Sequence, residues 1–341
     1  METKSMKIKA ILIYFLFQMQ FQMMGCERPM DSVENELNNY SDKIVFLSNR
    51  FGVQPDRNYY ELFRMDIDGK NPTRLIEGSV DYPSFSPDGI EIVCSIAEFD
   101  GDLFKLNLRD ASIVRLTYNH YGQYPIYSAD GSKIAFFHKH SIFIMDSDGA
   151  NLHDLTGQLS SSQPYFDLSS DGSKIVVDSS GEIIIVDIYG DSLTNITNHP
   201  ANDKMPVFTP GGAKIVFISD RGGSDQIYQM NSDGSNRQRL TNVEFELYGT
   251  LRISPMSDKI LYTINRAGFP TEICTMNADG SNQIILTEGF KPRFSPDSKK
   301  IVFESFRAAD TGWIDIYIMN TDGQNQINLT NNPATDVYPI F

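Results

Sequence analysis

Short apolar runs separated by polar turns fill the chain from about residue 42 onward. Short runs bounded by Gly, Pro, Asp and Ser are typical of β-strands rather than of helices. One apolar triplet beginning with Ile returns seven times, at Ile44–Phe46, Ile92–Cys94, Ile134–Phe136, Ile175–Val177, Ile215–Phe217, Ile260–Tyr262 and Ile301–Phe303. The first positions of successive triplets differ by 40 to 48 residues. A spacing of about 40–45 residues is typical of a four-stranded propeller blade.

Other positions keep the same register around the triplet. Nine residues before the Ile, four of the repeats carry a proline, at Pro83, Pro125, Pro206 and Pro292. A turn sequence such as Ser86-Pro87-Asp88-Gly89 lies between the two, and its residues favour a tight turn. The triplet is followed by a second apolar strand, an Asp-Gly hairpin and a strand that ends in Leu-Thr. Each repeat therefore supplies four short strands and leaves no room for a helix.

The two ends of the repeat region predict that the blades close into a ring. The first repeat opens at Lys43 without a Pro-containing strand, and the chain finishes with that strand as Tyr338-Pro339-Ile340-Phe341. The C-terminal strand would then be the innermost strand of the first blade, which removes the exposed edges of an open array. We predict an all-β fold for residues 42–341: a closed β-propeller of seven four-stranded blades, with six as the less favoured number.

Residues 1–25 are predicted to be a signal peptide. Lys4, Lys7 and Lys9 form a basic start, and Ala10–Phe17 is a short apolar stretch. A membrane-spanning helix needs about 20 apolar residues. This stretch is shorter and is followed by three interspersed Gln residues.

The end of the signal peptide, Gly25-Cys26, resembles the lipobox of bacterial lipoproteins. The resemblance implies that the Cys26 thiol carries a lipid and that Cys26 becomes the new N-terminus. The alternative is an ordinary cleaved signal with an incidental Cys. Residues 26–41 are acidic, polar and without periodicity, and we predict that they form a tether.

Charge and cysteine content narrow the function classes. The formal net charge is −15, and no Lys/Arg run offsets it locally, so nucleic acid is not an expected partner. Cys94 and Cys274 lie in apolar runs, which favours two buried free thiols over a disulfide between distant blades.

The repeats resemble the WD40-like repeats of TolB and related bacterial propellers. The resemblance is carried by the segment from Phe217 to Thr241, with Ser219-Asp220-Arg221-Gly222-Gly223 and Asn231-Ser232-Asp233-Gly234 in it. It extends over about residues 42–341. TolB proteins have an α/β domain before a six-bladed propeller, whereas this chain shows a short tether and seven repeats. The function of TolB is therefore not transferred by resemblance alone.

Two repeated polar patterns invite a functional interpretation. Asp-rich loops such as Asp146-Ser147-Asp148-Gly149 suggest calcium, but the Gly is in the wrong place for an EF-hand loop and a tight hairpin explains the pattern. An Arg recurs four residues after the triplet, at Arg50, Arg221, Arg266 and Arg307. It suggests a structural bond, with a neighbouring blade as one candidate acceptor, or a ring of ligand-binding guanidiniums.

Histidine chemistry is the main argument for an enzyme. Oligogalacturonate lyases are also seven-bladed and use His-bound metal, and this resemblance draws attention to His138-Lys139-His140. The two His could share one strand face, but no third ligand is identifiable. No nucleophile elbow or phosphate-binding loop is present in the sequence. We predict no metal and no cofactor.

A candidate binding rim follows from the loop lengths. The longest second-to-third-strand loops are Ser48–Glu61 and Glu304–Asp315, in the first and last blades, which become neighbours in a closed ring. Variable loops on a rigid frame commonly carry function, and aromatic and Arg residues are enriched at binding hot spots. Packing between blades is the alternative role for the aromatic residues. The candidate rim consists of Arg50, Phe51, Arg57, Tyr59, Arg307 and Trp313.

Together these features predict a monomeric cell-envelope lipoprotein in the periplasm, anchored by lipid in the outer rather than the inner membrane. Its TolB-like propeller would be a scaffold that binds an envelope protein or a glycan. This expectation rests on fold analogy and on the lack of a recognisable catalytic constellation. The alternative is a carbohydrate-active enzyme, a polysaccharide lyase of the oligogalacturonate-lyase type that acts at the mouth of the pore. A third hypothesis is a peptidase-like propeller that lacks its catalytic partner chain.

Overall fold

The computed structural model describes residues 43–341 except 52, 55–56, 119, 158, 160–163, 191, 243–245, 267 and 307–311, and it describes only the backbone of 53–54, 57–58 and 248. The predicted signal peptide, Cys26 and the tether lie outside these residues, as does Arg307. The described residues form antiparallel strands joined by turns, with a short 3-10 helix at Ala97–Phe99.

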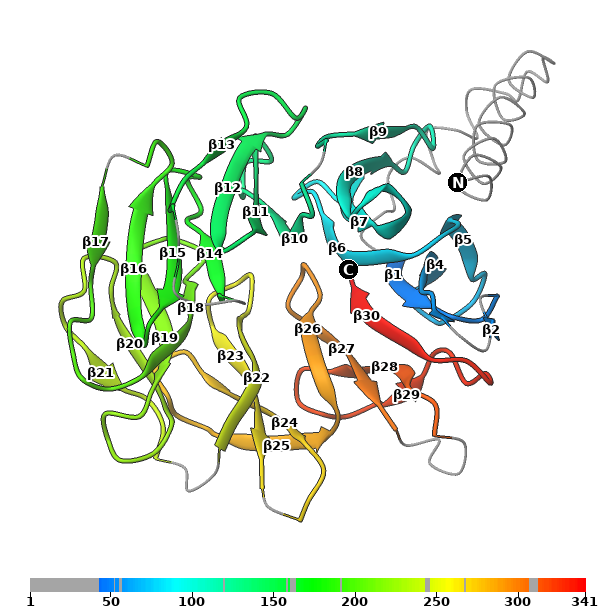
Figure 1. The fold of residues 1–341 in the computed structure, drawn as a ribbon. Coiled ribbons are helices and arrows are strands. Elements are labelled where there is room, and N and C mark those ends of the chain that lie inside the picture. The colour runs from blue at the N-terminus through cyan, green and yellow to red at the C-terminus, as the bar shows by residue number, and fades with distance from the viewer. Residues whose placement is uncertain are drawn as a thin grey trace. The chain divides into compact units, whose positions relative to one another are not determined.

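The strands form seven four-stranded sheets, which confirms the predicted number of blades (Figure 1). We number the blades 1 to 7 in the chain order of their triplets. In that order the innermost strands are β30 (Asp336–Ile340), β6 (Val80–Phe85), β10 (Gln123–Tyr127), β14 (Phe166–Leu168), β18 (Asp203–Phe208), β22 (Glu246–Ile253) and β26 (Phe290–Phe294). The second strands, which hold the triplets, are β1 (Lys43–Ser48), β7 (Glu91–Ile96), β11 (Lys133–His138), β15 (Lys174–Ser179), β19 (Lys214–Ser219), β23 (Lys259–Asn265) and β27 (Lys300–Ser305).

The outer half of each blade holds the two remaining strands. The third strands are β4 (Glu61–Asp66), β8 (Asp102–Asn107), β12 (Ser141–Asp146), β16 (Glu182–Asp187), β20 (Gln226–Asn231), β24 (Glu272–Asn277) and β28 (Asp315–Asn320). The outermost strands are β5 (Thr73–Ile76), β9 (Ile113–Arg115), β13 (His153–Asp154), β17 (Leu193–Asn195), β21 (Gln238–Arg239), β25 (Ile284–Glu288) and β29 (Ile327–Asn328). A small ribbon of β2 (Val53–Gln54) and β3 (Arg57–Asn58) decorates blade 1.

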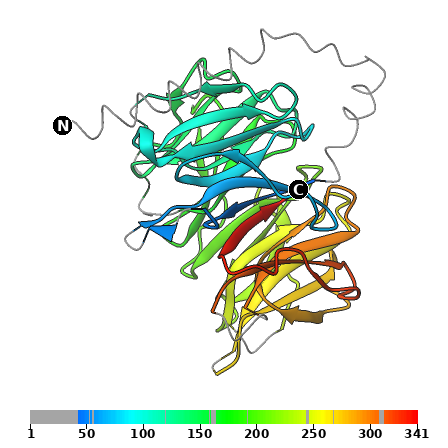
Figure 2. The ribbon, with the colours of Figure 1, turned by 90° about the vertical axis from the view of Figure 1, so that its right-hand side faces the viewer.

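The C-terminal strand completes blade 1, as the sequence predicts. β30 pairs antiparallel with β1, with Ile340 opposite Val45 and Val337 opposite Leu47. Figures 1 and 2 show the red C-terminal strand lying beside the blue first strand. β30 also packs against β6 of blade 2 and β26 of blade 7. Closure therefore pairs the inner edge of β1, which an open array would leave exposed.

Five of the seven inner strands contain a proline, and each of these prolines lies at a bulge. The residue before it has a φ between 49° and 54° in five blades, at Tyr82, Tyr124, Met205, Lys291 and Tyr338. The pairing register between first and second strands shifts at the same place. A bulge leaves one residue out of the ladder, so a proline without an N–H is tolerated there. The sequence predicted the proline column but not the left-handed residue beside it.

The repeated turns use their polar side chains internally. In the first-to-second turn of blade 2, the Ser86 hydroxyl donates to Asp88 (2.5 Å) and accepts the N–H of Glu91 (2.9 Å). In the third-to-fourth hairpin of blade 5, Asp233 accepts the N–H of Ser235 (2.9 Å). The corresponding Asp of the other Asp-Gly hairpins makes the same bond, at Asp68, Asp148, Asp279 and Asp322. The hairpin interpretation of these loops is confirmed.

The hydrophobic core lies between blades rather than within them. Each sheet face packs on the face of the next sheet, and among the described residues six clusters of buried apolar side chains each join two consecutive blades. In the cluster between blades 4 and 5, Val176 and Ile183 meet Ile215 and Phe217. Complete burial of one such side chain stabilises the fold by about 1.5–3 kcal/mol. Cys94 and Cys274 are buried free thiols, as predicted.

Replacing Gly234 by Ala is expected to destabilise the propeller strongly. Gly234 has a φ of 83°, and a Cβ there would lie 2.5 Å from the carbonyl oxygen of Ile196 in the preceding blade. A matched control is Gly223→Ala, because Gly223 has a φ of 97° but no atom within 4 Å of the added Cβ. Both variants carry the left-handed penalty of about 1–2 kcal/mol. Gly234→Ala should cost about 1–3 kcal/mol more in the free energy of unfolding, measured by urea denaturation. Equal losses would contradict the proposed clash.

Candidate functional site

A cavity of about 780 Å³ opens on one face of the ring, over blades 4 to 7. This face, which we call the loop face, carries the second-to-third-strand loops and the connections between blades. The opposite, hairpin face carries the first-to-second turns and the third-to-fourth hairpins. The cavity is lined by acidic, basic and aromatic side chains, among them Tyr165, Asp178, Asp203, Lys204, Glu246, Lys291 and Phe306. Concave sites of this size that combine apolar and polar groups are typical of ligand binding.

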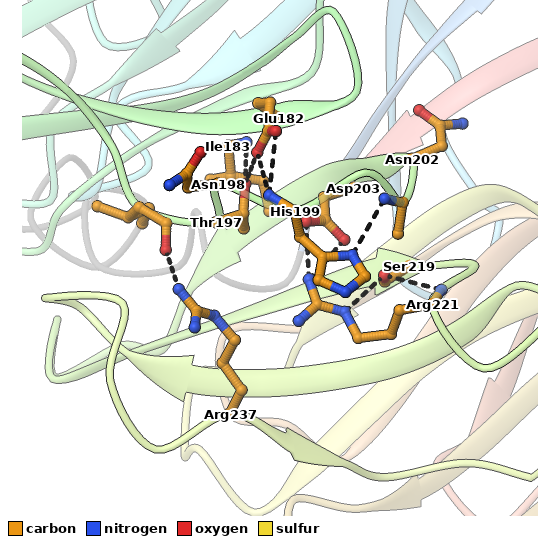
Figure 3. A network of polar contacts seen from close by, with 12 residues as sticks. Glu182, Ile183, Thr197, Asn198, His199, Asn202, Asp203, Ser219, Arg221 and Arg237 are labelled. Atoms are coloured by element: carbon orange, nitrogen blue, oxygen red, sulfur yellow. Dashed lines mark hydrogen bonds and ion pairs between the residues drawn. The ribbon is translucent and has the colours of Figure 1, made fainter.

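The recurring Arg fastens the start of an inner strand to the same blade. In blade 5, Arg221 donates from Nη2 to both carboxylate oxygens of Asp203 (2.8 and 2.7 Å) and from Nε to Ser219 (2.9 Å), as Figure 3 shows. Its guanidinium lies over the rings of Phe217 and Tyr228, at 5.5 and 5.2 Å. The Asp203 side chain is fully buried. Because Asp203 lines the cavity, this ion pair fixes part of the cavity wall.

Blade 1 repeats this geometry with different residues. Arg50 donates to Asp336 at the start of β30 (3.0 Å) and from Nε to Ser48 (2.8 Å). Its guanidinium lies 4.9 Å from the Phe63 ring centroid. In blade 6, Arg266 pairs instead with Glu272 on the third strand. In these three blades the paired carboxylate belongs to the same blade as the Arg, so the suggested ion pair with a neighbouring blade's carboxylate was wrong for Arg50, Arg221 and Arg266. The reason is that the loop turns the Arg back onto its own sheet.

A second network holds the connection between blades 4 and 5 beside the cavity. Glu182 accepts a hydrogen bond from the Thr197 hydroxyl and one from the N–H of His199 (3.2 Å). The His199 ring nitrogen Nδ1 accepts the N–H of Ala201 (3.0 Å), as drawn in Figure 3. The next residue, Asn202, donates its N–H to Asp220 (2.8 Å) and lines the cavity. This wall of the cavity is therefore pre-formed by side-chain bonds to the backbone.

Two buried carboxylates hold the left-handed inner-strand residues of the next blade. Asp178 accepts the N–H groups of Tyr165 and Met205, each at 2.9 Å, and Glu304 accepts the N–H of Tyr338 at 2.7 Å. Burial raises the pKa of the Asp178 carboxyl to about 6. Burial also raises the pKa of Glu304, against the lowering effect of Lys291, whose ammonium lies 3.4 Å away. Carboxylates at equivalent positions thus connect blades 4 to 5 and 7 to 1.

Exposed aromatic side chains gather on the loop face. Of the seven exposed aromatic residues in the described part of the chain, only Tyr189 lies on the hairpin face. Phe306 borders the cavity, and its ring packs 5.2 Å from that of Phe290. Aromatic side chains provide much of the binding energy at protein interfaces. The six on the loop face are Phe51, Tyr118, Tyr121, Tyr165, Phe269 and Phe306.

The predicted rim residues take different positions around blades 1 and 7. Phe51 is 68% exposed and lies under Arg74 of β5, at the outer part of blade 1. Arg50 is held in the ion pair with Asp336. Tyr59 and Trp313 are half-buried, and each has an interaction with the protein. The side chain of Arg57 and the whole of Arg307 lie outside the described residues. The rim as a binding site stays a prediction.

The cavity residues in blades 4 to 7 were not found from the sequence. The second-to-third-strand loops of blades 4 to 6 are short, and the search followed loop length. In blade 7 it selected Arg307 and Trp313 on the long loop but not Phe306, which precedes them on the same loop. A usable signal was present in the inner strands. Polar or charged residues stand on either side of the proline column, where a purely apolar core would have apolar residues. Before the column these are Tyr165, Lys291 and Tyr338, and after it they are Asp167, Arg252 and Arg293.

His138 and His140 do not share a strand face. β11 ends at His138 and β12 begins at Ser141, so Lys139 and His140 form the turn between them, both with positive φ. The His138 ring instead packs on His120, with ring centroids 5.0 Å apart. Burial lowers the pKa of His138. Among the residues that the structure describes, no three His, Cys, Asp or Glu side chains gather in a way that could hold a metal ion.

Within the described residues there is also no helix of the length and apolarity that crossing a bilayer requires.

Comparisons with known proteins identify the type of repeat. Residues 160–291, which span blades 4 to 6, match the family model described as the TolB beta propeller domain. The Tol-Pal system protein TolB of Francisella tularensis subsp. mediasiatica is 28% identical over 208 residues, covering 57% of this chain and 47% of that protein. The same protein of Francisella tularensis subsp. holarctica matches equally well. The chain thus spans about half the length of the curated relatives it matches.

Solved structures share the fold. TolB from Acinetobacter baumannii superposes with a TM-score of 0.60 at 20% identity, covering 91% of this chain and 69% of that chain. Oligogalacturonate lyase from Vibrio parahaemolyticus superposes with a TM-score of 0.63 at 16% identity, covering 84% and 85%. At these identities the likeness concerns architecture alone. The family match supports the propeller repeat family that the sequence resemblance indicated: residues 160–291 match repeats of the TolB propeller type.

Proposed function

We propose that this propeller is a protein-binding scaffold of the bacterial cell envelope and that its partner binds the loop face. The observation that carries this proposal is the concentration of exposed aromatic side chains on that face, two of which, Tyr165 and Phe306, line a pre-formed cavity. Exposed aromatic residues on a rigid frame offer contact area at a low cost in conformational entropy. The curated relatives are named Tol-Pal system proteins, which is consistent with a partner that is a protein.

The cell-envelope location is part of the proposal. It is supported by the basic and apolar start of the chain and by Cys26 after Gly25, which would carry the lipid anchor. The acidic tether of residues 26–41 would separate the propeller from the membrane surface. An outer-membrane anchor, a monomeric propeller and a glycan as alternative partner remain part of the hypothesis. No geometry among the described residues favours the lyase alternative, since the His120–His138 pair has no third ligand there.

The test is crosslinking of the tagged full-length protein in its native cells, followed by identification of the co-purified proteins. We expect one envelope protein to be recovered, with recovery reduced at least about tenfold when loop-face aromatics are removed. The control changes two exposed side chains of the hairpin face, Tyr189 (75% exposed) and Met256 (71% exposed), and should leave recovery unchanged. The loop-face variant is Tyr165→Ala/Phe269→Ala/Phe306→Ala, and the hairpin-face variant is Tyr189→Ala/Met256→Ala.

A third variant, Arg57→Ala/Tyr59→Ala/Trp313→Ala, distinguishes binding at the predicted rim from binding at the cavity side chains. Loss of the partner in this variant alone would locate the interface at the predicted rim. Equal recovery in the wild type and in both loop-face variants would contradict binding at the loop face.

A further inference from the structure

One ring of inner-strand residues lies opposite the middle residue of each triplet. In blades 1 to 7 its members are Ile340, Ser84, Ile126, Asp167, Val207, Arg252 and Arg293. The charged members come from blades 4, 6 and 7, the blades beneath the cavity, and we call Asp167, Arg252 and Arg293 the charged layer. Each follows a cavity-lining residue by two positions on the same chain segment, after Tyr165, Thr250 and Lys291. Each inner strand begins at the loop face and runs toward the hairpin face. The charged layer therefore lies one step deeper in the ring than the residues that line the cavity.

The three charges of this layer are unevenly satisfied. Asp167 accepts the N–H of Phe208 (2.9 Å). Arg252 donates from Nη1 to the carbonyl oxygen of its own neighbour Leu251 (2.9 Å). For Arg293, the described part of the chain provides no hydrogen bond and no ion pair within bonding distance. The charged groups whose fields act on it are Arg252, which has the same sign, and Glu304, which has the opposite sign.

This arrangement differs from that of other Arg residues in the loop-face half of the ring. Arg50, Arg115 and Arg221 each pair with a carboxylate whose side chain is fully buried. The Lys291 ammonium is paired with Glu304 (3.4 Å). Two guanidiniums and one carboxylate therefore leave a single net positive charge in the layer, inside a protein whose formal charge is −15. Burial, and then the like charge of Arg252, lower the pKa of Arg293 to about 9, which means that its surroundings disfavour the charged guanidinium.

We propose that the charged layer is a binding site for one carboxylate group, which enters through the cavity from the loop face and is held between the guanidiniums of Arg252 and Arg293. A guanidinium presents paired N–H donors that match the two oxygens of a carboxylate. One carboxylate neutralises the single excess positive charge, whereas a doubly charged phosphate would reverse it. Asp167 limits the affinity of the site, because its own carboxylate competes for Arg252.

This inference rests on the proposed function, because a partner docked on the loop face is the first source of such a group, as an acidic side chain or a chain end. A free organic acid offers the same chemistry. Both sources reach the layer through the same cavity, and the experiment below separates them.

The test is calorimetric titration of succinate into the full-length protein at low ionic strength, with uncharged succinamide as the matched probe. Succinate should bind and succinamide should not. Arg293→Gln should weaken succinate binding at least about tenfold, because a charge-assisted hydrogen bond is lost. Asp167→Asn should tighten succinate binding several-fold. A gain in affinity cannot be produced by misfolding, so this variant controls for a loss of binding in Arg293→Gln that is caused by misfolding alone. Lys299→Gln, on the hairpin face and 79% exposed, should bind as the wild type does.

Succinate binding that is unchanged in Arg293→Gln, or weaker in Asp167→Asn, would overturn the site. The crosslinking experiment repeated with Arg293→Gln identifies the source: reduced recovery of the partner means that the partner supplies the carboxylate, and unchanged recovery with lost succinate binding means a free acid. If the loop-face aromatic variants leave partner recovery intact while succinate still depends on Arg293, the proposed function fails and the carboxylate site stands.

Discussion

Deletion of residues 336–341 is expected to abolish cooperative folding of the propeller. These residues contain β30, the innermost strand of blade 1, and its removal exposes the whole inner edge of β1. Val337 and Ile340 are buried, and each contributes about 1.5–3 kcal/mol through burial alone. The ladder with β1 and the Arg50–Asp336 ion pair disappear as well. A typical domain has a net stability of about 5–15 kcal/mol, so this loss removes much or all of it.

The measurement is thermal unfolding followed by circular dichroism, with size-exclusion chromatography to detect association through the open edge. A control keeps the same six residues and changes only their place in the chain. It inserts residues 336–341 before Lys43, joined by a copy of the Ser86–Ile90 turn that links the corresponding strands in blade 2. This permuted chain should unfold cooperatively near the wild-type temperature. A truncated protein as stable as the wild type would contradict a structural role for strand closure.

Asp203→Ala is expected to lower the free energy of unfolding by about 3–5 kcal/mol, the range typical of a buried ion pair that loses one partner. The Asp203 carboxylate is fully buried and receives two hydrogen bonds from Arg221, whose side chain is 14% exposed. Removing it leaves the Arg221 guanidinium enclosed by Phe217 and Tyr228 without a counter-ion. The start of β18 and the adjoining cavity wall should loosen together.

Urea denaturation of the wild type and of two variants tests this expectation. Asp203→Asn keeps an acceptor for Arg221 and should lose less stability than Asp203→Ala. Lys299→Ala breaks a pair of exposed charges (3.5 Å) and should change the free energy by less than about 1 kcal/mol. A loss in Asp203→Ala no larger than in Lys299→Ala would show that the ion pair does not fasten the inner strand.

The repeat pattern determined the architecture because each repeat is a small unit with the same local rules. Short apolar runs make the strands, and Ser-Pro-Asp-Gly and Asp-Gly sequences make turns whose hydrogen bonds stay within a few residues. Closure was readable for the same reason, since Tyr338–Phe341 repeats a strand that the first blade lacks. Such features depend on neighbours in the chain, and the sequence shows those neighbours directly.

The partners of the polar side chains were decided only by the tertiary structure. The sequence showed that Arg50 and Arg221 share a column, but their acceptors Asp336 and Asp203 lie 286 and 18 residues away along the chain. The cavity over blades 4 to 7 and the charged layer below it arise where seven inner strands converge. Whether a polar inner-strand residue faces a partner, the cavity or the next blade depends on the bulges and on ring closure. These are properties of the assembled ring, because the bulges and the packing of neighbouring blades decide which groups surround each inner-strand side chain.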